Sequence, residues 1–297
     1  MTLPVTEAKL IEGKVFAQQI QAEIKKEVED LSLNKKILPR LAALQSRPDP
    51  ASEWYINQQE KLAAKLGILF ERFSPVQLAS QKTLVEKIKQ LNADPECHGI
   101  FIAMPLPQEF DLDQVLLALD AHKDVEGIHP TSLGLIVLRR AKLIPPTAFA
   151  ALKLIEMTVS EMNKNLRGMK TVIVGQSAIV GRPLQLLLGQ RRVTTIVCNT
   201  GTSRNDLQKA VEESDIVVAC AGQPGLIKGE WIKPGSIVID VGTTEVNGQL
   251  AGDIEFEEAK KRAAFITPVP GGVGPLTVTL LMRNLINAYK WQHQLTN

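Results

Sequence analysis

The sequence has few aromatic residues, no long apolar run and almost no net charge. Aromatic residues make up 4% of the 297 residues and no Lys/Arg cluster is interleaved with them, which argues against a nucleic-acid partner. No stretch reaches the roughly 18 apolar residues that span a membrane, and residues 1–16 lack the apolar centre of a secretion signal. Because 34 basic and 32 acidic residues nearly cancel, we expect a cytoplasmic protein that acts on small molecules.

Cysteine and histidine are also scarce. The three cysteines, Cys97, Cys198 and Cys220, are odd in number and each lies within an apolar stretch, so we expect buried thiols rather than disulfides. Neither the cysteines nor the histidines show the spacing of metal ligands, and no metal site is predicted. The four histidines are His98, His122, His129 and His293.

Strand-like and helix-like patterns alternate along the chain, which predicts an α/β fold with mostly parallel sheets covered by helices on both faces. The alternation breaks after about residue 157 and resumes at residue 171, which indicates a second doubly wound unit. The expected strands are 40–44, 68–73, 98–104, 171–174, 193–198, 215–221, 236–241 and 263–266, and the clearest helices are 13–31, 51–66, 81–91, 147–157 and 276–291.

An apolar, β-branched run at 171–174 leads into the glycine-containing stretch GQSAIVGRP. A strand, a tight turn and a helix start together form an anion site, because free amide groups and the helix dipole point at a phosphate. A helix that begins near Val180 would meet the phosphate, and Gly175, Ser177 and Gly181 would keep the approach of that phosphate clear. The spacing is not the standard G-x-G-x-x-G, so by itself it fits a structural turn equally well.

Three prolines and three glycines occur in FITPVPGGVGPLT, residues 265–277. Such a stretch cannot be ordinary helix or central strand, since proline lacks the ladder donor and glycine adopts unusual backbone angles. We expect a shaped loop.

These two stretches resemble signatures of the methylenetetrahydrofolate dehydrogenase/cyclohydrolase family, and the resemblance extends from about Gly13 to Ala288. It implies two α/β domains, each a mostly parallel sheet with flanking helices. A folate domain would cover 1–145 and a Rossmann-like dinucleotide-binding domain 146–275, with 276–297 returning to the first domain as a helix. The resemblance also implies a homodimer.

The cofactor implied is NADP. An acidic residue after the second strand favours NAD, and the segment after Cys198 has none, whereas Thr200, Thr202 and Arg204 could meet a 2′-phosphate. NAD stays open, because Gln176 and Gly201 stand where relatives carry basic residues, and Arg204 could equally be a solvated charge. The resemblance places the cofactor contacts at Gly175, Gln176, Ser177, Val180, Gly181, Thr200, Thr202, Gly222, Gly242, Thr243, Gly274 and Thr277.

The folate half departs from the family pattern. ASEWYINQQEK, residues 51–61, resembles a helix in which Tyr55 packs on the folate and a lysine four residues later handles a proton, but this chain has Gln59 there. Lys61 is about 240° round the helix from Tyr55 and cannot stand in. Ala103 replaces the glutamine that supports the lysine, and Glu126 replaces an aspartate that holds the pterin. Pro270, Gly271 and Gly272 complete the implied substrate contacts.

Hydrolysis of the methenyl product needs a group that titrates, and glutamine does not. We therefore expect NADP-linked oxidation of methylene-tetrahydrofolate to methenyl-tetrahydrofolate, positioned by Tyr55 and Glu126, with a weak or absent cyclohydrolase step. His129 is the candidate substitute proton carrier, although a loop histidine without a role is the more common case. Two alternatives remain: a family member acting on a different substrate, and a non-catalytic paralogue that binds dinucleotide or folate.

Overall fold

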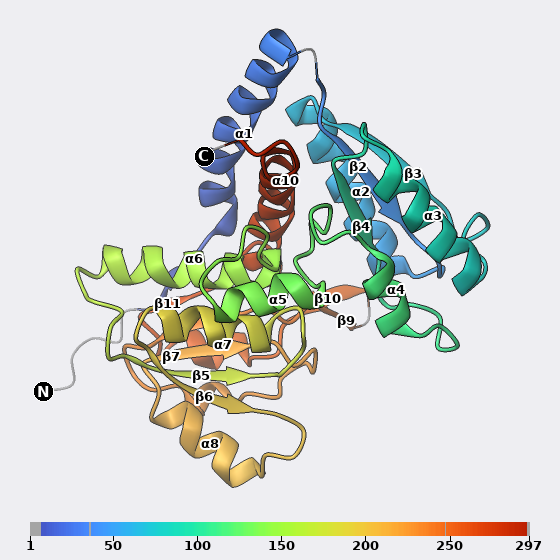
Figure 1. The fold of residues 1–297 in the computed structure, drawn as a ribbon. Helices are drawn as coiled ribbons and strands as arrows, with labels where there is room; N and C mark the ends of the chain where they lie inside the picture. Colours follow the sequence, from blue (N-terminus) through green and yellow to red (C-terminus); the bar gives the residue numbers. More distant parts are fainter. Residues whose placement is uncertain (1–6, 36, 247, 296–297) are drawn as a thin grey trace, which may run out of the picture. The chain divides into compact units, whose positions relative to one another are not determined.

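The computed structural model describes residues 7–35, 37–246 and 248–295 (Figure 1). Their contacts divide the chain into two compact units. The large-sheet unit contains the described residues up to Ala17 together with Thr147–Thr277, and the small-sheet unit contains Gln18–Pro146 together with the described residues from Val278. Both are built from parallel strands and helices, which confirms the α/β class.

The large-sheet unit has a six-stranded sheet in the order β1-β11-β8-β7-β5-β6, in which all neighbouring strands are parallel. From β5 onward this is a doubly wound order, and the direction of winding reverses between β5 and β7. Ligands of such sheets bind at that switch point, beyond the carboxyl ends of the strands. The strands are β1 (Lys9–Leu10), β5 (Lys170–Val174), β6 (Thr194–Cys198), β7 (Ile216–Ala219), β8 (Ile237–Asp240) and β11 (Phe265–Ile266).

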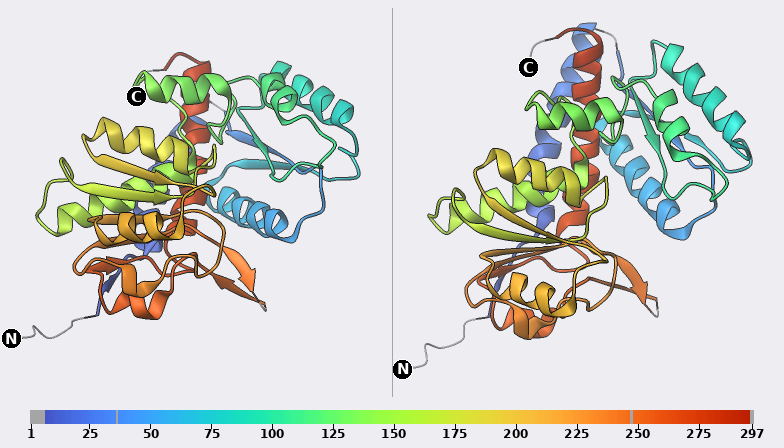
Figure 2. Two further views of the ribbon diagram at one scale, coloured as in Figure 1. Left: turned by 90° about the horizontal axis from the view of Figure 1, so that it is seen from below. Right: turned by 60° about the horizontal axis from the view of Figure 1, so that its bottom comes forward.

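The central strands are short apolar runs such as IVVA in β7, and all four of its residues are buried. Strands that are buried on both faces need apolar, β-branched residues throughout, because helices cover each face. Helices α6 (Pro146–Glu161) and α7 (Gly181–Gln190) cover one face, and α8 (Arg204–Glu212) and α9 (Phe256–Lys260) cover the other (Figure 2). A short 3₁₀ turn, η1 (Gly229–Trp231), brings Trp231 into the core.

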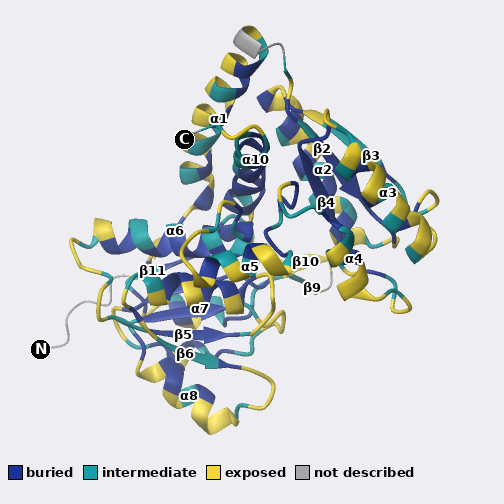
Figure 3. Cartoon of the chain, in the orientation of Figure 1, coloured by how far each residue is buried: buried dark blue, intermediate teal, exposed yellow. Residues whose placement is uncertain are grey.

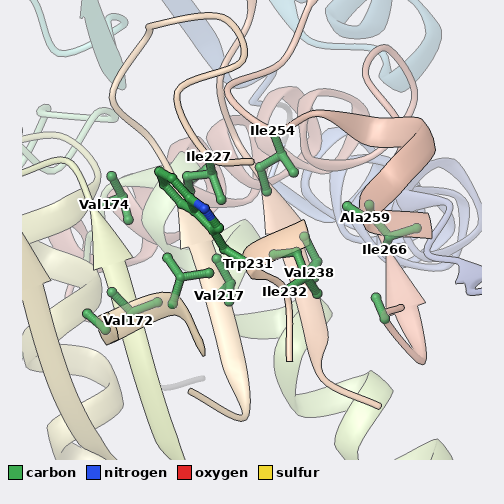
Figure 4. Packing of buried hydrophobic residues seen from close by; sticks show 14 of the residues in the cluster. Val172, Val174, Val217, Ile227, Trp231, Ile232, Val238, Ile254, Ala259 and Ile266 are labelled. Carbon is green, nitrogen blue, oxygen red and sulfur yellow. The ribbon is translucent and has the colours of Figure 1, made fainter. Parts of the chain in front are cut away.

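Figure 4 shows the core between this sheet and α9, where Val172, Val217 and Val238 from three adjacent strands meet Trp231 and Ile232. Fully burying one such aliphatic side chain contributes about 1.5–3 kcal/mol. This packing fixes the positions of the strand ends, from which the candidate site is built.

The small-sheet unit has three parallel strands in the order β3-β2-β4. Residues of β2 and β4 are almost wholly buried (Figure 3), because helices pack on both sides of them. The strands are β2 (Arg40–Leu44), β3 (Leu69–Phe73) and β4 (Gly99–Ile102), and the helices within the unit are α2 (Pro50–Leu66), α3 (Gln81–Ala93), α4 (Leu112–Ala118) and α5 (Pro130–Val137). Helices α1 (Gly13–Lys35) and α10 (Val273–Gln292) begin in the large-sheet unit and continue into this one.

Helix α2 shows why its limits lie where they do. Asp49 accepts a hydrogen bond from the Ser52 amide at 2.8 Å, and Pro50 occupies the first turn, where its missing N–H is not needed. Gly67 ends the helix in the left-handed region with φ 76°. The capping residue is therefore Asp49, and Ser52 lies in the first turn.

The structure differs from the sequence expectations in three places. Lys9–Leu10 pairs with β11, so the described residues up to 17 group with the large sheet rather than with the rest of 1–145. A two-stranded antiparallel hairpin, β9 (Thr244–Val246) with β10 (Gln249–Ala251), was not expected. Helix α10 begins at Val273 instead of 276, because Pro275 in its first turn is compatible with helix.

Within the described residues, no helix combines the length and the apolar character that crossing a membrane requires. The same residues contain no group of three or more His, Cys, Asp or Glu side chains arranged to hold a metal ion.

Candidate active site

The glycine loop after β5 is shaped by close backbone contacts. Gly175 has φ 122°, and a Cβ on it would lie 2.3 Å from the carbonyl oxygen of Cys220. A Cβ on Gly181 would lie 2.0 Å from the carbonyl oxygen of Gly175. Only glycine fits both positions. The Ser177 hydroxyl accepts a hydrogen bond from the Val180 amide at 3.1 Å, which closes the turn.

Helix α7 begins directly after this turn, and the N-cap residue Val180 offers no side-chain acceptor to the first helical amide groups. Four amide groups at a helix start lack intrahelical partners, and they carry the positive end of the helix dipole. The structure therefore has the strand, tight turn and helix start that the sequence predicts, and phosphate binding there stays a prediction.

The segment after β6 is folded by its own side chains. The Thr202 hydroxyl accepts a hydrogen bond from the backbone amide of Asn199 at 3.0 Å. The side-chain oxygen of Asn199 accepts one from the backbone amide of Gly201 at 2.9 Å. The Asn199 side chain also donates to Gln176 at 3.3 Å, which joins this segment to the glycine loop. The structure thus brings Gln176 and Thr202 to one edge of the sheet, and Thr200 lies exposed beside them.

Arg204 does not extend freely from this loop. Its guanidinium lies 5.8 Å from the centre of the Trp231 ring, at cation–π distance, at the first residue of α8. This contact accounts for the position of Arg204 without a 2′-phosphate, and the polar side chains of Gln176, Thr200 and Thr202 stay at that edge.

Two buried carboxyl groups organise the loops after β7 and β8. Asp253 accepts hydrogen bonds from the amides of Ala221 and Gly222 at 2.6 and 3.0 Å. Asp240 accepts from the amides of Gly242 and Asp253 at 3.0 and 3.1 Å. Burial, with the charge of Asp253 as a further contribution, raises the pKa of Asp240 to about 7. Asp240 and Asp253 therefore hold these loops together through hydrogen bonds from backbone amides.

The loop at 268–272 is held against the start of α1. Gly271 has φ 110°, and the Gly13 amide donates to the carbonyl oxygen of Gly271 at 3.2 Å. A Cβ on Gly272 would lie 2.7 Å from the carbonyl oxygen of Pro268. The predicted shaped loop is present, although it ends at Val273, so that Gly274 and Thr277 belong to the first turns of α10. Thr277 donates its hydroxyl to the Val273 carbonyl at 3.3 Å.

In the small-sheet unit, Tyr55 and Gln59 lie one turn apart on α2. The Tyr55 ring packs on Phe101 of β4, with 5.8 Å between ring centres, and Ala103 is buried in the same apolar cluster. The Gln59 side chain is fully buried, and by distance and angle neither end of its amide makes a hydrogen bond within the described part of the chain. An amide buried in this way is unusual, since leaving such a group unpaired costs about 1–3 kcal/mol.

Glu126 supplies the titrating group of this region. Burial raises the pKa of Glu126 to about 8, and the neighbouring Asp124 adds to the rise. The pKa of Tyr55 is raised well above its ordinary value by burial and by Glu126, while Gln59 lies close enough to offset part of that rise. The residue surfaces of Tyr55 and Glu126 are only partly covered, but their titrating ends are enclosed by protein.

Lys61 and Lys123 do not supply the missing ammonium group. Lys61 is exposed, and the buried Lys123 donates to the carbonyl oxygens of Leu91, Asn92 and Asp94 at 2.7–2.9 Å, where it closes the end of α3. His129 accepts a hydrogen bond from the Thr131 amide at 3.0 Å and caps α5. Its backbone amide donates to Asp124, so this histidine has a local structural role.

Comparison with known proteins identifies the family to which the chain belongs. Residues 11–126 match the catalytic domain of tetrahydrofolate dehydrogenase/cyclohydrolase, and residues 145–293 match the NAD(P)-binding domain of the same family. The chain belongs to this family. The match to the second domain model covers the doubly wound sheet and its glycine loop, which confirms the predicted Rossmann-like fold there.

Family relatives cover nearly the whole chain. The bifunctional protein FolD 2 of Myxococcus xanthus is 43% identical over 282 residues, which is 95% of this chain and 96% of that protein. The FolD of Trypanosoma brucei, solved with NADP and an inhibitor, has a TM-score of 0.89 at 36% identity and covers 97% of this chain and 99% of its own. The methylenetetrahydrofolate dehydrogenase of Bombyx mori has the same TM-score at 29% identity, with the same coverage of both chains.

Proposed function

We propose that this family member oxidises 5,10-methylene-tetrahydrofolate to the 5,10-methenyl form with NADP, and that its cyclohydrolase step is weak or absent. The observation that carries the second half is the buried, uncharged Gln59, one helical turn from Tyr55 on α2, together with Ala103 at the family's glutamine position. The family membership and the glycine loop after β5 support the first half.

The large-sheet unit supplies the cofactor contacts in this proposal. The amides after Gly175 and at the start of α7 bind the pyrophosphate, and Gln176, Thr200 and Thr202 face the adenosine end. The sheet edge there presents hydroxyl and amide groups, which favours NADP over NAD only modestly. Bound there, NADP would supply a hydride acceptor for the methylene bridge of the folate.

The small-sheet unit supplies the folate contacts. Tyr55 is held by Phe101 so that its ring can pack on the pteridine, and Glu126 offers a carboxyl group to the ring nitrogens. Neither role needs an ammonium group, because hydride transfer requires positioning rather than proton transfer. The family resemblance adds Pro270, Gly271 and Gly272, which belong to the large-sheet unit, to the proposed substrate contacts.

Hydrolysis of the methenyl form is different. A water molecule must lose a proton as it attacks the bridge carbon, and a positioned base contributes about 10²- to 10⁴-fold to such a step. An amide cannot accept that proton, and Ala103 offers no polar group to a base at position 59. We therefore assign the chain to the oxidation alone.

The test is incubation with methylene-tetrahydrofolate and NADP, followed by absorbance and chromatography of the folates. Methenyl-tetrahydrofolate should accumulate and turn into the formyl form no faster than in buffer. Formyl product at the rate of a bifunctional relative would refute the amide argument. Parallel titrations with NADP and NAD decide the cofactor, and sedimentation equilibrium tests the homodimer that we infer from the family. A cytoplasmic location is part of the same proposal.

One observation favours a second candidate. The fully buried Gln59 amide makes no hydrogen bond by distance and angle among the described residues, although it lies close enough to Tyr55 to affect the pKa of that side chain, and an uncharged amide in place of the family's lysine fits a pocket adapted to a different substrate. Thermal shift separates the cases. Stabilisation by both NADP and a folate supports the dehydrogenase, stabilisation by NADP alone supports the changed substrate, and binding of both without turnover identifies a non-catalytic paralogue.

A further inference from the structure

The Asp253 carboxylate is fully buried in the loop between β10 and α9. Its Oδ2 accepts both the Ala221 amide at 2.6 Å and the Gly222 amide at 3.0 Å. Its Oδ1 is buried without a partner among the described residues and faces Gly242, where an added Cβ would lie 2.3 Å away. Burying a carboxylate costs free energy unless hydrogen bonds compensate, so a buried carboxylate that accepts from backbone amides indicates a specific structural role.

Asp240 in turn secures Asp253. Its Oδ1 accepts the backbone amide of Asp253 at 3.1 Å, and its Oδ2 accepts that of Ile254 at 3.0 Å. The Asp240 amide itself donates to the Thr267 hydroxyl at 2.7 Å. A Cβ on Gly252 would lie 2.1 Å from Asp240, so this loop cannot move inward. The two carboxyl groups therefore join the loops after β7, β8 and β10.

The turn held by Asp253 supports the glycine loop after β5. The Cys220 amide donates to the carbonyl of Val174 at 2.8 Å, and its thiol donates to the carbonyl of Gly175 at 3.6 Å. A Cβ on Gly175 would lie 3.0 Å from the Ala221 nitrogen and 2.3 Å from the Cys220 oxygen. The loops after β5 and β7 thus touch at the switch point of the sheet, where ligands of doubly wound folds bind.

We propose that Asp253 is a positioning residue of the dinucleotide site: it fixes the Ala221–Gly222 turn on which Gly175 rests, and so sets the opening of the phosphate-binding loop. This inference rests on the dinucleotide function proposed above. It assigns to Asp253 a role carried through two amide groups, without contact between its side chain and the cofactor.

The electrostatics of the cluster agree with this arrangement. Burial raises the pKa of the Cys220 thiol to about 12, and the charges of Asp253 and Asp240 add to the rise, so the thiol remains a donor to Gly175. Burial also raises the pKa of Asp240 to about 7, because the charged form is disfavoured away from water, and the charge of Asp253 adds to the rise. Two neighbouring buried carboxyl groups lower the free energy of unfolding unless hydrogen bonds from the loop amides offset the cost of burying them.

The experiment compares Asp253→Asn with Asp253→Ala. The asparagine oxygen can accept both amides, whereas alanine can accept neither. We expect the alanine variant to raise the Kd and KM for NADP about tenfold or more, with kcat at saturating NADP within about threefold of wild type. The asparagine variant should stay within about threefold of wild type in Kd, KM and kcat. Glu257→Ala, which removes an exposed carboxylate on α9, is the matched control and should bind as wild type.

Unchanged NADP binding in Asp253→Ala would overturn the proposal, and so would an asparagine variant as weak as the alanine variant. Amide hydrogen exchange on the nucleotide-free wild type tests the contact even if the alanine variant does not fold. Slow exchange at Ala221 and Gly222 is expected, and exchange as fast as at exposed amides would refute the positioning. If the wild type bound no dinucleotide, the proposed function would fail, while the exchange result would still judge the contact.

Discussion

The backbones of Gly175 and Cys220 approach so closely that an added Cβ on Gly175 would lie 2.3 Å from the Cys220 carbonyl oxygen. This contact joins the ends of β5 and β7, the two strands between which the winding of the sheet reverses. Gly175, which the sequence marks as part of a phosphate loop, is therefore also the residue at which the loops after β5 and β7 contact each other.

The substitution Gly175→Ala should therefore abolish dinucleotide binding and lower stability by about 1–3 kcal/mol or more, because alanine meets both a clash and an unfavourable φ of 122°. Isothermal titration with NADP and thermal unfolding measure the two effects. Gly189→Ala in α7 is the control, since nothing lies within 4 Å of its Cβ position. That variant should bind NADP normally and gain about 0.5–1 kcal/mol. Equal behaviour of the two variants would contradict this reading.

The double substitution Gln59→Lys with Ala103→Gln should create or raise cyclohydrolase activity, by a factor on the order of 10² or more. A lysine in this fully buried position would have its pKa lowered, which suits a group that must exchange protons near neutral pH. The measurement is the rate at which methenyl-tetrahydrofolate becomes formyl-tetrahydrofolate.

Gln58→Lys adds the same side chain at the neighbouring, half-buried position and should leave hydrolysis at the buffer rate. If the double variant hydrolyses no faster than Gln58→Lys, the missing ammonium group is not what limits the reaction.

Glu126 should make folate binding depend on pH. Its pKa of about 8 means that the carboxyl group is mostly protonated at pH 7, whereas charge-assisted bonds to the pteridine need the carboxylate. The KM for methylene-tetrahydrofolate should therefore fall as the pH rises from 7 to 9. Glu126→Gln should show a higher KM at pH 9 and a nearly flat profile. A wild-type KM that does not change over this range would count against the role of Glu126.

Glu126 should also make folding stability depend on pH, and here a rise in pH is unfavourable. Since folding raises the pKa of Glu126 from 4.5 to about 8, its contribution is complete below pH 4.5 and is lost as the pH rises to about 8. Without ligand, Glu126→Gln should therefore lose less stability than wild type between pH 5 and pH 9, measured by urea unfolding.

Because His98 is buried, we expect the protein to lose folding stability in acid. Burial lowers the pKa of His98 from 6.5 to about 4, with His293, Lys123 and Arg40 adding positive charge and Asp94 opposing them. Its contribution is complete above pH 6.5 and is lost as the pH falls to about 4, an effect on the order of 3 kcal/mol.

His98→Gln keeps an acceptor for the Arg40 amide, which now donates to Nδ1 of His98 at 3.1 Å, but cannot gain a charge. Its stability should fall less steeply than wild type over this range. Parallel unfolding curves for the two proteins between pH 7 and pH 4 would contradict the assignment.

Regular elements with strong local patterns were predictable from sequence. The strand at 40–44 is observed at the predicted residues, because the short apolar run 41–44 between the polar residues Arg40 and Gln45 specifies it locally. The strand Lys9–Leu10 was missed, since two residues carry no period and exist as a strand only through pairing with β11. The hairpin at β9 and β10 is similarly short. The roles of Tyr55, Gln59, Ala103 and Glu126 remain predictions for the experiments above.

The sequence by itself determined the α/β class, the family, the glycine loop and the absence of lysine at position 59, because each is a local pattern or a residue identity. Only the tertiary structure decided that Arg204 rests on Trp231, that Lys123 closes the end of α3, and that Asp253 holds the turn beneath Gly175. The partners in these contacts are 27 to 32 residues apart, and which side chains meet across such distances depends on how strands pair and pack.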